Sequence, residues 1–316
     1  MKNSEIYKRT LRFSWMNVLV KLIGVVIMLA LPTIAFALTA SQGEVVAVAA
    51  TSVAFIVGLV LFALIARYIG YLYTAGQIAM MTEGIANGEL PADVYAAGKQ
   101  RVKQKFVTAS VYFALMSIIG AISAQITNAI NAVAGSNNPV GNALSMVISV
   151  VLTYVNYCSL GWVFLHDEQS SFKSTCDGAV IYFQNWKTLL KNAAKIIGFT
   201  LISLVVIGGI FSVMAFFVLG AIPPVVQALS VVDEILEVDA NVSFYVSCVI
   251  VGVILWYIPH SALVQPYILV SVLRSYIEAG MANPPKVDVY DKLTNISRSF
   301  RKALDKAERE EGMAAA

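Results

Sequence analysis

The sequence predicts an all-α, polytopic membrane protein with six transmembrane helices arranged as three helical hairpins, together with amphipathic interfacial helices. Hydrophobic residues make up 58% of the chain and charged residues only 13%, with a mean hydropathy of +0.74, whereas soluble domains carry about 25% charged residues. Six segments also contain the ~20 predominantly apolar residues that a bilayer crossing needs. These segments are about 22–40, 45–66, 106–130, 143–165, 196–222 and 244–272.

The distribution of Lys and Arg predicts how these spans are oriented. All 22 basic residues lie in alternate connections and the two ends, namely 1–21, 67–105, 166–195 and 273–316. The other connections contain no Lys or Arg: 41–44, 131–142 and 223–243. Because basic loops remain in the cytoplasm, we expect a multi-pass protein of the cytoplasmic membrane, most plausibly bacterial, with both termini in the cytoplasm.

Three parts follow from this threading: a basic amphipathic lead-in over 1–21, a six-span domain over 22–272 and a cytoplasmic tail over 273–316. The N-terminal region also resembles a secretory signal, because Ala35-Phe36-Ala37 looks like a cleavage site. The long basic start favours a retained first span.

Basic, amphipathic segments precede the first, third and fifth spans. Trp favours the headgroup boundary and Lys reaches past it to lipid phosphates. We therefore expect these segments to lie in the interface and to contact membrane lipids, anionic ones among them. The candidate headgroup contacts lie before the first and fifth spans and are Trp15, Lys21, Trp186, Lys187, Lys191 and Lys195. The alternative is that they only anchor the topology. Before the third span, Lys99 with Lys103 and Arg101 with Lys105 recur at four-residue spacing.

The connections outside the spans contain further helical patterns. Apolar periodicity after Arg67 predicts that the second span continues as a helix until Asn87-Gly88. Pro223-Pro224 begins another helix, on which Asp233 and Glu237 are expected to form a solvated acidic face and not a cation site. In the tail, one stripe predicts an amphipathic helix that docks on its own chain, on a partner protein or on a second copy: Leu293, Ile296, Phe300, Leu304 and Ala307.

The sixth span contains two prolines and two neutral polar residues, Pro259, His260, Gln265 and Pro266. Each proline removes one backbone hydrogen bond and leaves a carbonyl that needs another donor, such as Ser261. This region is the candidate hinge or ligand-contacting break, of a type that transporters use. The alternative is a kinked helix with a structural role only.

Neutral polar residues also recur along the third and fourth predicted spans. They are Gln125, Asn128, Ser145, Ser149, Thr153 and Asn156. Because a short turn joins these spans, their polar faces can meet, either as interhelical contacts or along a water-lined path.

The sequence contains no catalytic or metal-binding motif that we recognise. It has two histidines, one in the sixth predicted span and one at the edge of the fourth, and three isolated cysteines. It has no Walker loop, nucleophile elbow or His-Glu-x-x-His motif. We therefore expect no cofactor, no metal and no enzymatic activity. We expect no nucleic-acid binding, because the basic residues follow the topology.

The segment Tyr182–Lys191, YFQNWKTLLK, resembles segments before membrane helices in bacterial polytopic families of unknown function, and in membrane domains attached to some glycerophosphodiesterases. The resemblance assigns no functional residue. Two functions remain as expectations. The first is a non-catalytic membrane component that binds lipid or a partner. The second is a passive channel or facilitator, for a small neutral or lipid-like solute, that uses the broken sixth span.

Overall fold

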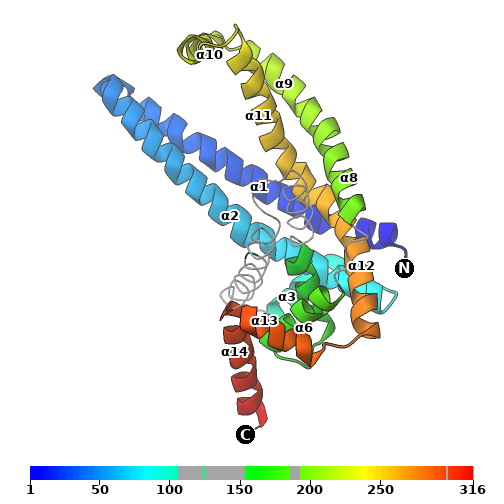
Figure 1. Ribbon diagram of the computed structural model, residues 1–316. Coiled ribbons are helices and arrows are strands. Elements are labelled where there is room, and N and C mark those ends of the chain that lie inside the picture. Colours follow the sequence, from blue (N-terminus) through cyan, green and yellow to red (C-terminus); the bar gives the residue numbers. More distant parts are fainter. Residues whose placement is uncertain (106–123, 125–153, 186–192, 297, 316) are drawn as a thin grey trace. The chain divides into compact units, whose positions relative to one another are not determined.

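The computed structural model describes residues 1–105, 124, 154–185, 193–296 and 298–315. These residues are helical and contain no β-strand (Figure 1), which confirms the all-α prediction. Four described stretches have the length and composition of membrane spans: Asn3–Gln42, Val45–Ala86, Lys195–Gly220 and Val242–Ala282. Most of the third predicted span, and 143–153 of the fourth, lie outside the described residues.

The helices divide into two compact units, which are described separately. Unit 1 comprises 1–194 and 269–316, and unit 2 comprises 195–268. Unit 1 contains α1 (Asn3–Thr39), α2 (Glu44–Ala86), α3 (Val94–Lys105), α6 (Ser171–Gln184), most of α12 (Gln265–Ala282), α13 (Val287–Ile296) and α14 (Arg298–Ala315). A further helix covers 154–165.

Helices α1 and α2 pack side by side in opposite directions (Figure 1). Gly43, with a φ of +114°, makes the turn between them. Gly58 lies so close to Met28 that a Cβ would approach the Met28 Cα to 3.0 Å, and Gly76 lies equally tightly against the Phe13 ring. Small residues thus bring the two helices into close contact, as expected in membranes.

The lead-in over 1–21 is not a separate interfacial helix, in contrast to the sequence-based expectation. It is continuous with the first span in the 37-residue helix α1. The reason is a second, buried face that the amphipathic pattern of Tyr7, Leu11 and Trp15 does not reveal. This buried face packs on α2 and consists of Ile6, Thr10, Phe13, Ser14, Asn17, Val20, Lys21 and Gly24.

Polar side chains join the α1–α2 pair beyond its apolar part. The Gln77 amide donates to Ser14 Oγ at 2.9 Å and to the Thr10 carbonyl at 3.4 Å. The Asn17 amide donates to Thr74 Oγ1 at 3.2 Å. These bonds satisfy buried polar groups and thereby fix the register of the two helices. As predicted, α2 continues to Ala86, and Gly88 follows with a φ of +75°.

The tail packs on its own chain. Phe300 is fully buried, its ring lies 5.8 Å from that of Tyr290, and Lys306 lies over the ring of Phe172 on α6 at 4.1 Å. Lys173 Nζ donates to the Tyr290 hydroxyl at 3.1 Å. The predicted amphipathic helix is thus two helices, α13 and α14, and its apolar residues Leu293 and Phe300 are covered by the chain itself.

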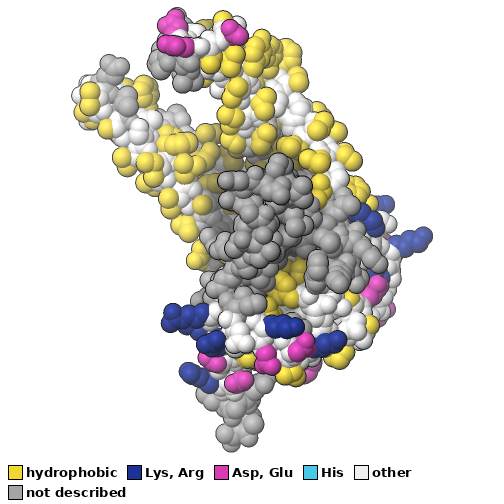
Figure 2. Space-filling model, in the orientation of Figure 1, with side chains coloured by type: hydrophobic (Ala, Val, Ile, Leu, Met, Phe, Trp, Pro, Cys, Tyr) yellow, Lys and Arg dark blue, Asp and Glu magenta, His cyan; other side chains and the backbone are white. Residues whose placement is uncertain are grey.

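Unit 2 is a helical pair capped by a short helix. It contains α8 (Ala193–Ser203), a π-helical segment η2 (Leu204–Gly208), α9 (Gly209–Gly220), α10 (Pro223–Leu236), α11 (Val242–Pro259) and a second π-helical segment η3 (His260–Val264). Helices α9 and α11 pack around Ala215, Phe244 and Cys248. Acidic side chains cluster at α10 (Figure 2).

Asp233 does not belong to a solvated acidic face, as the sequence had suggested. It is 5% exposed, and its two carboxylate oxygens accept from the backbone N–H groups of Asn241, at 2.9 Å, and Ser243, at 2.7 Å. Hydrogen bonding from Ser243, together with the Asn241 N–H, lowers the pKa of Asp233. The carboxylate therefore caps the start of α11, where free N–H groups favour an anion.

Candidate functional site

The predicted sixth span departs from α-helical geometry where its two prolines lie. Helix α11 ends at Pro259, the π-helical segment η3 follows, and α12 resumes with Gln265 and Pro266. The Gln265 N–H donates to the His260 carbonyl, five residues earlier, as a π-helix requires. Ser261 Oγ donates to the carbonyls of Tyr257, at 2.6 Å, and Ile258, at 3.2 Å. Ser261 and Gln265 thus add hydrogen bonds within the irregular segment, at carbonyls next to the prolines.

His260 contacts the fifth span through Ser203. Its Nδ1 lies 2.9 Å from Ser203 Oγ, and Trp256 Nε1 donates to the same oxygen at 3.2 Å. Ser203 Oγ in turn donates to the Thr200 carbonyl at 2.8 Å. The rings of Trp256 and His260 stack at 4.5 Å between centroids.

These contacts join two irregular helices at the same point. Ser203 immediately precedes η2, and His260 begins η3. The Ser–His distance matches that of a nucleophile and its base, but Ser203 is 6% exposed and its oxygen also accepts the indole N–H. The arrangement is therefore a closed polar contact between spans. Sequence reasoning missed Ser203 because π-helical segments have no simple sequence signature.

The predicted polar seam lies mostly outside the described residues, which exclude Gln125, Asn128, Ser145, Ser149 and Thr153. Asn156 belongs to the helix over 154–165, where its Oδ1 is buried. Ser159 and Trp162 follow on the same face, at three-residue spacing. This part of the fourth predicted span is therefore packed inside unit 1.

The headgroup candidates have different environments. Trp15 and Lys195 are exposed, whereas Lys21 is only 7% exposed and lies in the face of α1 that packs on α2. Lys21 is therefore buried between the two helices, on the same face of α1 as Asn17 and Gly24, whereas a headgroup contact would lie on the surface. Trp186, Lys187 and Lys191 lie outside the described residues.

The exposed side chains of α1 and α2 change from polar to apolar at the same height along the helical pair. Before Trp15, every exposed residue of α1 is polar or charged, and from Trp15 to Leu38 large hydrophobic residues are exposed. On α2, such exposure runs from Val45 to Leu72 and then stops. The Asn17–Thr74 hydrogen bond places Trp15 opposite the turn after Leu72.

The length of this apolar surface matches a bilayer. At 1.5 Å per residue, Trp15 to Leu38 measures about 35 Å and Val45 to Leu72 about 40 Å. A hydrocarbon core is about 30 Å thick, and the whole bilayer about 40–45 Å. Figure 2 shows hydrophobic side chains along the α1–α2 pair and Lys and Arg around the part of unit 1 beyond it. The level of Trp15 and Leu72 is therefore expected to coincide with lipid headgroups.

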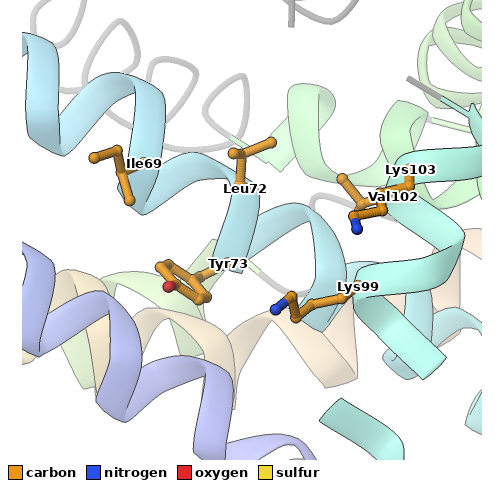
Figure 3. A pocket seen from close by; sticks show the side chains of 6 residues that line it. All are labelled: Ile69, Leu72, Tyr73, Lys99, Val102 and Lys103. Carbon is orange, nitrogen blue, oxygen red and sulfur yellow. The ribbon is translucent and has the colours of Figure 1, made fainter. Parts of the chain in front are cut away.

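A groove of about 210 Å³ lies at this level between α2 and α3 (Figure 3). Helix α2 contributes Ile69, Leu72 and Tyr73, and helix α3 contributes Lys99, Val102 and Lys103. The Lys99 side chain extends from α3 toward the Tyr73 side of the groove (Figure 3). The groove thus combines an apolar wall with two ammonium groups. Sequence reasoning found the spacing of the two lysines but not the groove, which needs the packing of α3 on α2.

The two basic pairs of α3 have different partners. Arg101 forms an ion pair with Asp167, and Lys105 lies 3.5 Å from the same carboxylate. Burial opposes ionisation of Asp167, but hydrogen bonding and the charges of Arg101 and Lys105 outweigh it and lower its pKa. Lys99 and Lys103 lie on the opposite face of α3. Within the described part of the chain, neither has an acidic partner within 4 Å.

Among the described residues, no group of three or more His, Cys, Asp or Glu side chains could hold a metal ion. No family model, curated protein or solved structure matches this chain. The function must therefore be argued from the geometry of the molecule itself.

Proposed function

We propose that this chain is a non-catalytic integral membrane protein that binds membrane lipid at its cytoplasmic boundary. The observation that carries the proposal is the single level at which the exposed surfaces of α1 and α2 change from apolar to polar. Trp15 and the groove of α2 and α3 lie at that level. Aromatic and basic side chains are typical of residues that contact headgroups.

The topology belongs to the same proposal. Six crossings, arranged as three hairpins in the cytoplasmic membrane of a bacterium, would keep every Lys and Arg on the cytoplasmic side. Because Leu293 and Phe300 are covered by the chain itself, these two tail residues are not available for docking on a partner protein.

Lipid retention tests the proposal. The full-length protein, purified in a mild detergent, is equilibrated with equal amounts of phosphatidylglycerol and phosphatidylcholine, and the retained lipids are identified by mass spectrometry. We expect phosphatidylglycerol to be enriched at low salt and the enrichment to fall at 1 M salt, where the screening length is about 3 Å. Retention of the two lipids in the ratio supplied would refute the proposal.

A second function has one specific observation in its favour. The fifth and sixth spans both contain π-helical segments, which are frequent at functional sites, and Ser203 and His260 join them. A passive facilitator would use this irregular region as its gate. Solute uptake into liposomes that falls with His260→Ala would support this function, and uptake equal to that of protein-free liposomes would exclude it.

A further inference from the structure

We propose that the groove between α2 and α3 is a specific site for one anionic glycerophospholipid, whose phosphate binds between Lys99 and Lys103. This assignment rests on the lipid-binding function proposed above and names the residues and ligand class. The position of the groove, the charges in it and the character of its wall each support it.

The position of the groove suits a phospholipid. Leu72 is the last exposed large hydrophobic residue of α2, so the groove begins where the apolar surface ends. An acyl chain that lies along the exposed side chains of α2 would bring its headgroup to Tyr73 and α3. A soluble ligand would gain nothing from this continuity with the membrane-facing surface.

The charges in the groove suit an anion. Lys99 and Lys103 are separated by one helical turn and point to the same side of α3. Both are exposed, and within the described residues no carboxylate lies within 4 Å of either. Tyr95 supports Lys99, whose Nζ lies 5.6 Å from the ring centroid, and the Arg12 guanidinium lies over the same ring at 4.4 Å.

The other basic pair of α3, Arg101 and Lys105, explains why Lys99 and Lys103 face the groove. Arg101 and Lys105 are held by Asp167, and Lys105 Nζ also donates to the His166 carbonyl at 2.9 Å. These contacts fix α3 against the rest of unit 1 and leave its opposite face, with Lys99 and Lys103, turned to the groove. A lysine ammonium is a compact phosphate ligand.

The apolar wall of the groove is expected to contribute to the overall affinity for lipid. Val102 is 7% exposed, whereas Ile69 and Leu72 are exposed. An apolar wall of this kind binds the glycerol and the first methylenes of an acyl chain, independently of the charge of the headgroup. The structure therefore predicts that charge selectivity and overall lipid affinity depend on different residues.

Lipid titration followed by native mass spectrometry tests the site, with dioleoyl-phosphatidylglycerol and dioleoyl-phosphatidylcholine as probes. We expect Lys99→Ala/Lys103→Ala to weaken phosphatidylglycerol binding about 30-fold, equivalent to about 2 kcal/mol at ~1 kcal/mol for each basic residue. Binding of phosphatidylcholine should change little. Lys99→Arg/Lys103→Arg should retain the preference, which shows that the charge matters and that the variant folds.

The matched control is Arg298→Ala/Lys302→Ala. This exposed pair has the same four-residue spacing, but it lies on α14 and should leave both affinities unchanged. Leu72→Gln should weaken both lipids similarly, because it makes the wall polar without changing the charge. If Leu72→Gln has no effect, the wall does not contact lipid and the site as proposed is wrong.

Two further outcomes separate this site from the general function. If wild-type protein prefers phosphatidylglycerol and Lys99→Ala/Lys103→Ala keeps that preference, the groove is wrong while lipid binding stands. If wild-type protein shows no preference, the function itself fails. Inorganic phosphate should compete only weakly, and competition as strong as that of the lipid would overturn the assignment to a phospholipid.

Discussion

The contact between α9 and α11 makes a sharp prediction for Gly252→Ala. A Cβ at Gly252 would lie 2.7 Å from the backbone nitrogen and 2.8 Å from the Cα of Ser212. Backbone atoms cannot rotate away as a flexible side chain can, so the two helices must separate. The Ser212 hydroxyl, which donates to the Gly208 carbonyl at 2.9 Å, would be displaced as well.

Gly209→Ala is the control from which the steric cost of Gly252→Ala can be measured. A Cβ at Gly209, in the same helical pair, would meet nothing within 4 Å. Both variants gain the helix propensity of Ala over Gly, about 1 kcal/mol, so the difference between them isolates the steric cost. Overpacking of this kind costs about 1–3 kcal/mol. We therefore expect Gly252→Ala to be less stable than Gly209→Ala by about that amount.

Reversible unfolding in mixed micelles, with SDS as denaturant and far-ultraviolet circular dichroism as the readout, measures this difference. Gly209→Ala should unfold at or above the wild-type midpoint and Gly252→Ala below it. Equal midpoints for the two variants would refute the close approach of α9 and α11.

Three further predictions concern contacts outside the spans. Phe300→Ala should weaken docking of the tail by about 3–5 kcal/mol, because it removes a fully buried ring, and trypsin should then cleave the tail faster; unchanged cleavage would contradict the docking. Asp233→Asn leaves one of two backbone N–H groups without its carboxylate partner, so amide hydrogen exchange at 241 or 243 should accelerate, and unchanged exchange at both would exclude the cap. Because the pKa of Asp167 is lowered in the folded state, its contribution to stability is present above about pH 4 and is lost as the pH falls further; wild type and Asp167→Asn should thus differ in thermal stability at pH 7 and converge at low pH, whereas a constant difference would contradict the ion pair with Arg101.

Periodicity and charge were sufficient to predict the long helices. The all-α architecture and the extension of α2 to Ala86 were confirmed. After Pro259 the helix becomes π-helical, and whether it acts as a hinge stays a prediction. The confirmed features depend on local rules, namely apolar length and glycine at a helix end. The same rules did not reveal the buried face of the lead-in, because Lys21 looks like an interfacial residue in the sequence.

The candidate site was only partly visible in the sequence, because its parts meet through tertiary packing. Lys99 and Lys103 are recognisable by their spacing, but Ile69 and Leu72 join them only once α3 packs on α2. Likewise, Ser203 contacts His260 from a distance of 57 residues. A polar residue in an apolar span shows that a partner is needed, but it does not identify that partner.

Cysteine accessibility tests the membrane threading most directly. The native residues Cys158, Cys176 and Cys248 are buried, so single cysteines can be introduced at the exposed positions Gln42, Glu89 and Asp239 and labelled with a membrane-impermeant maleimide in intact cells. The account predicts labelling of Gln42→Cys and Asp239→Cys from outside, and of Glu89→Cys only after the membrane is opened. Labelling of Glu89→Cys in intact cells, or protection of the other two, would contradict it.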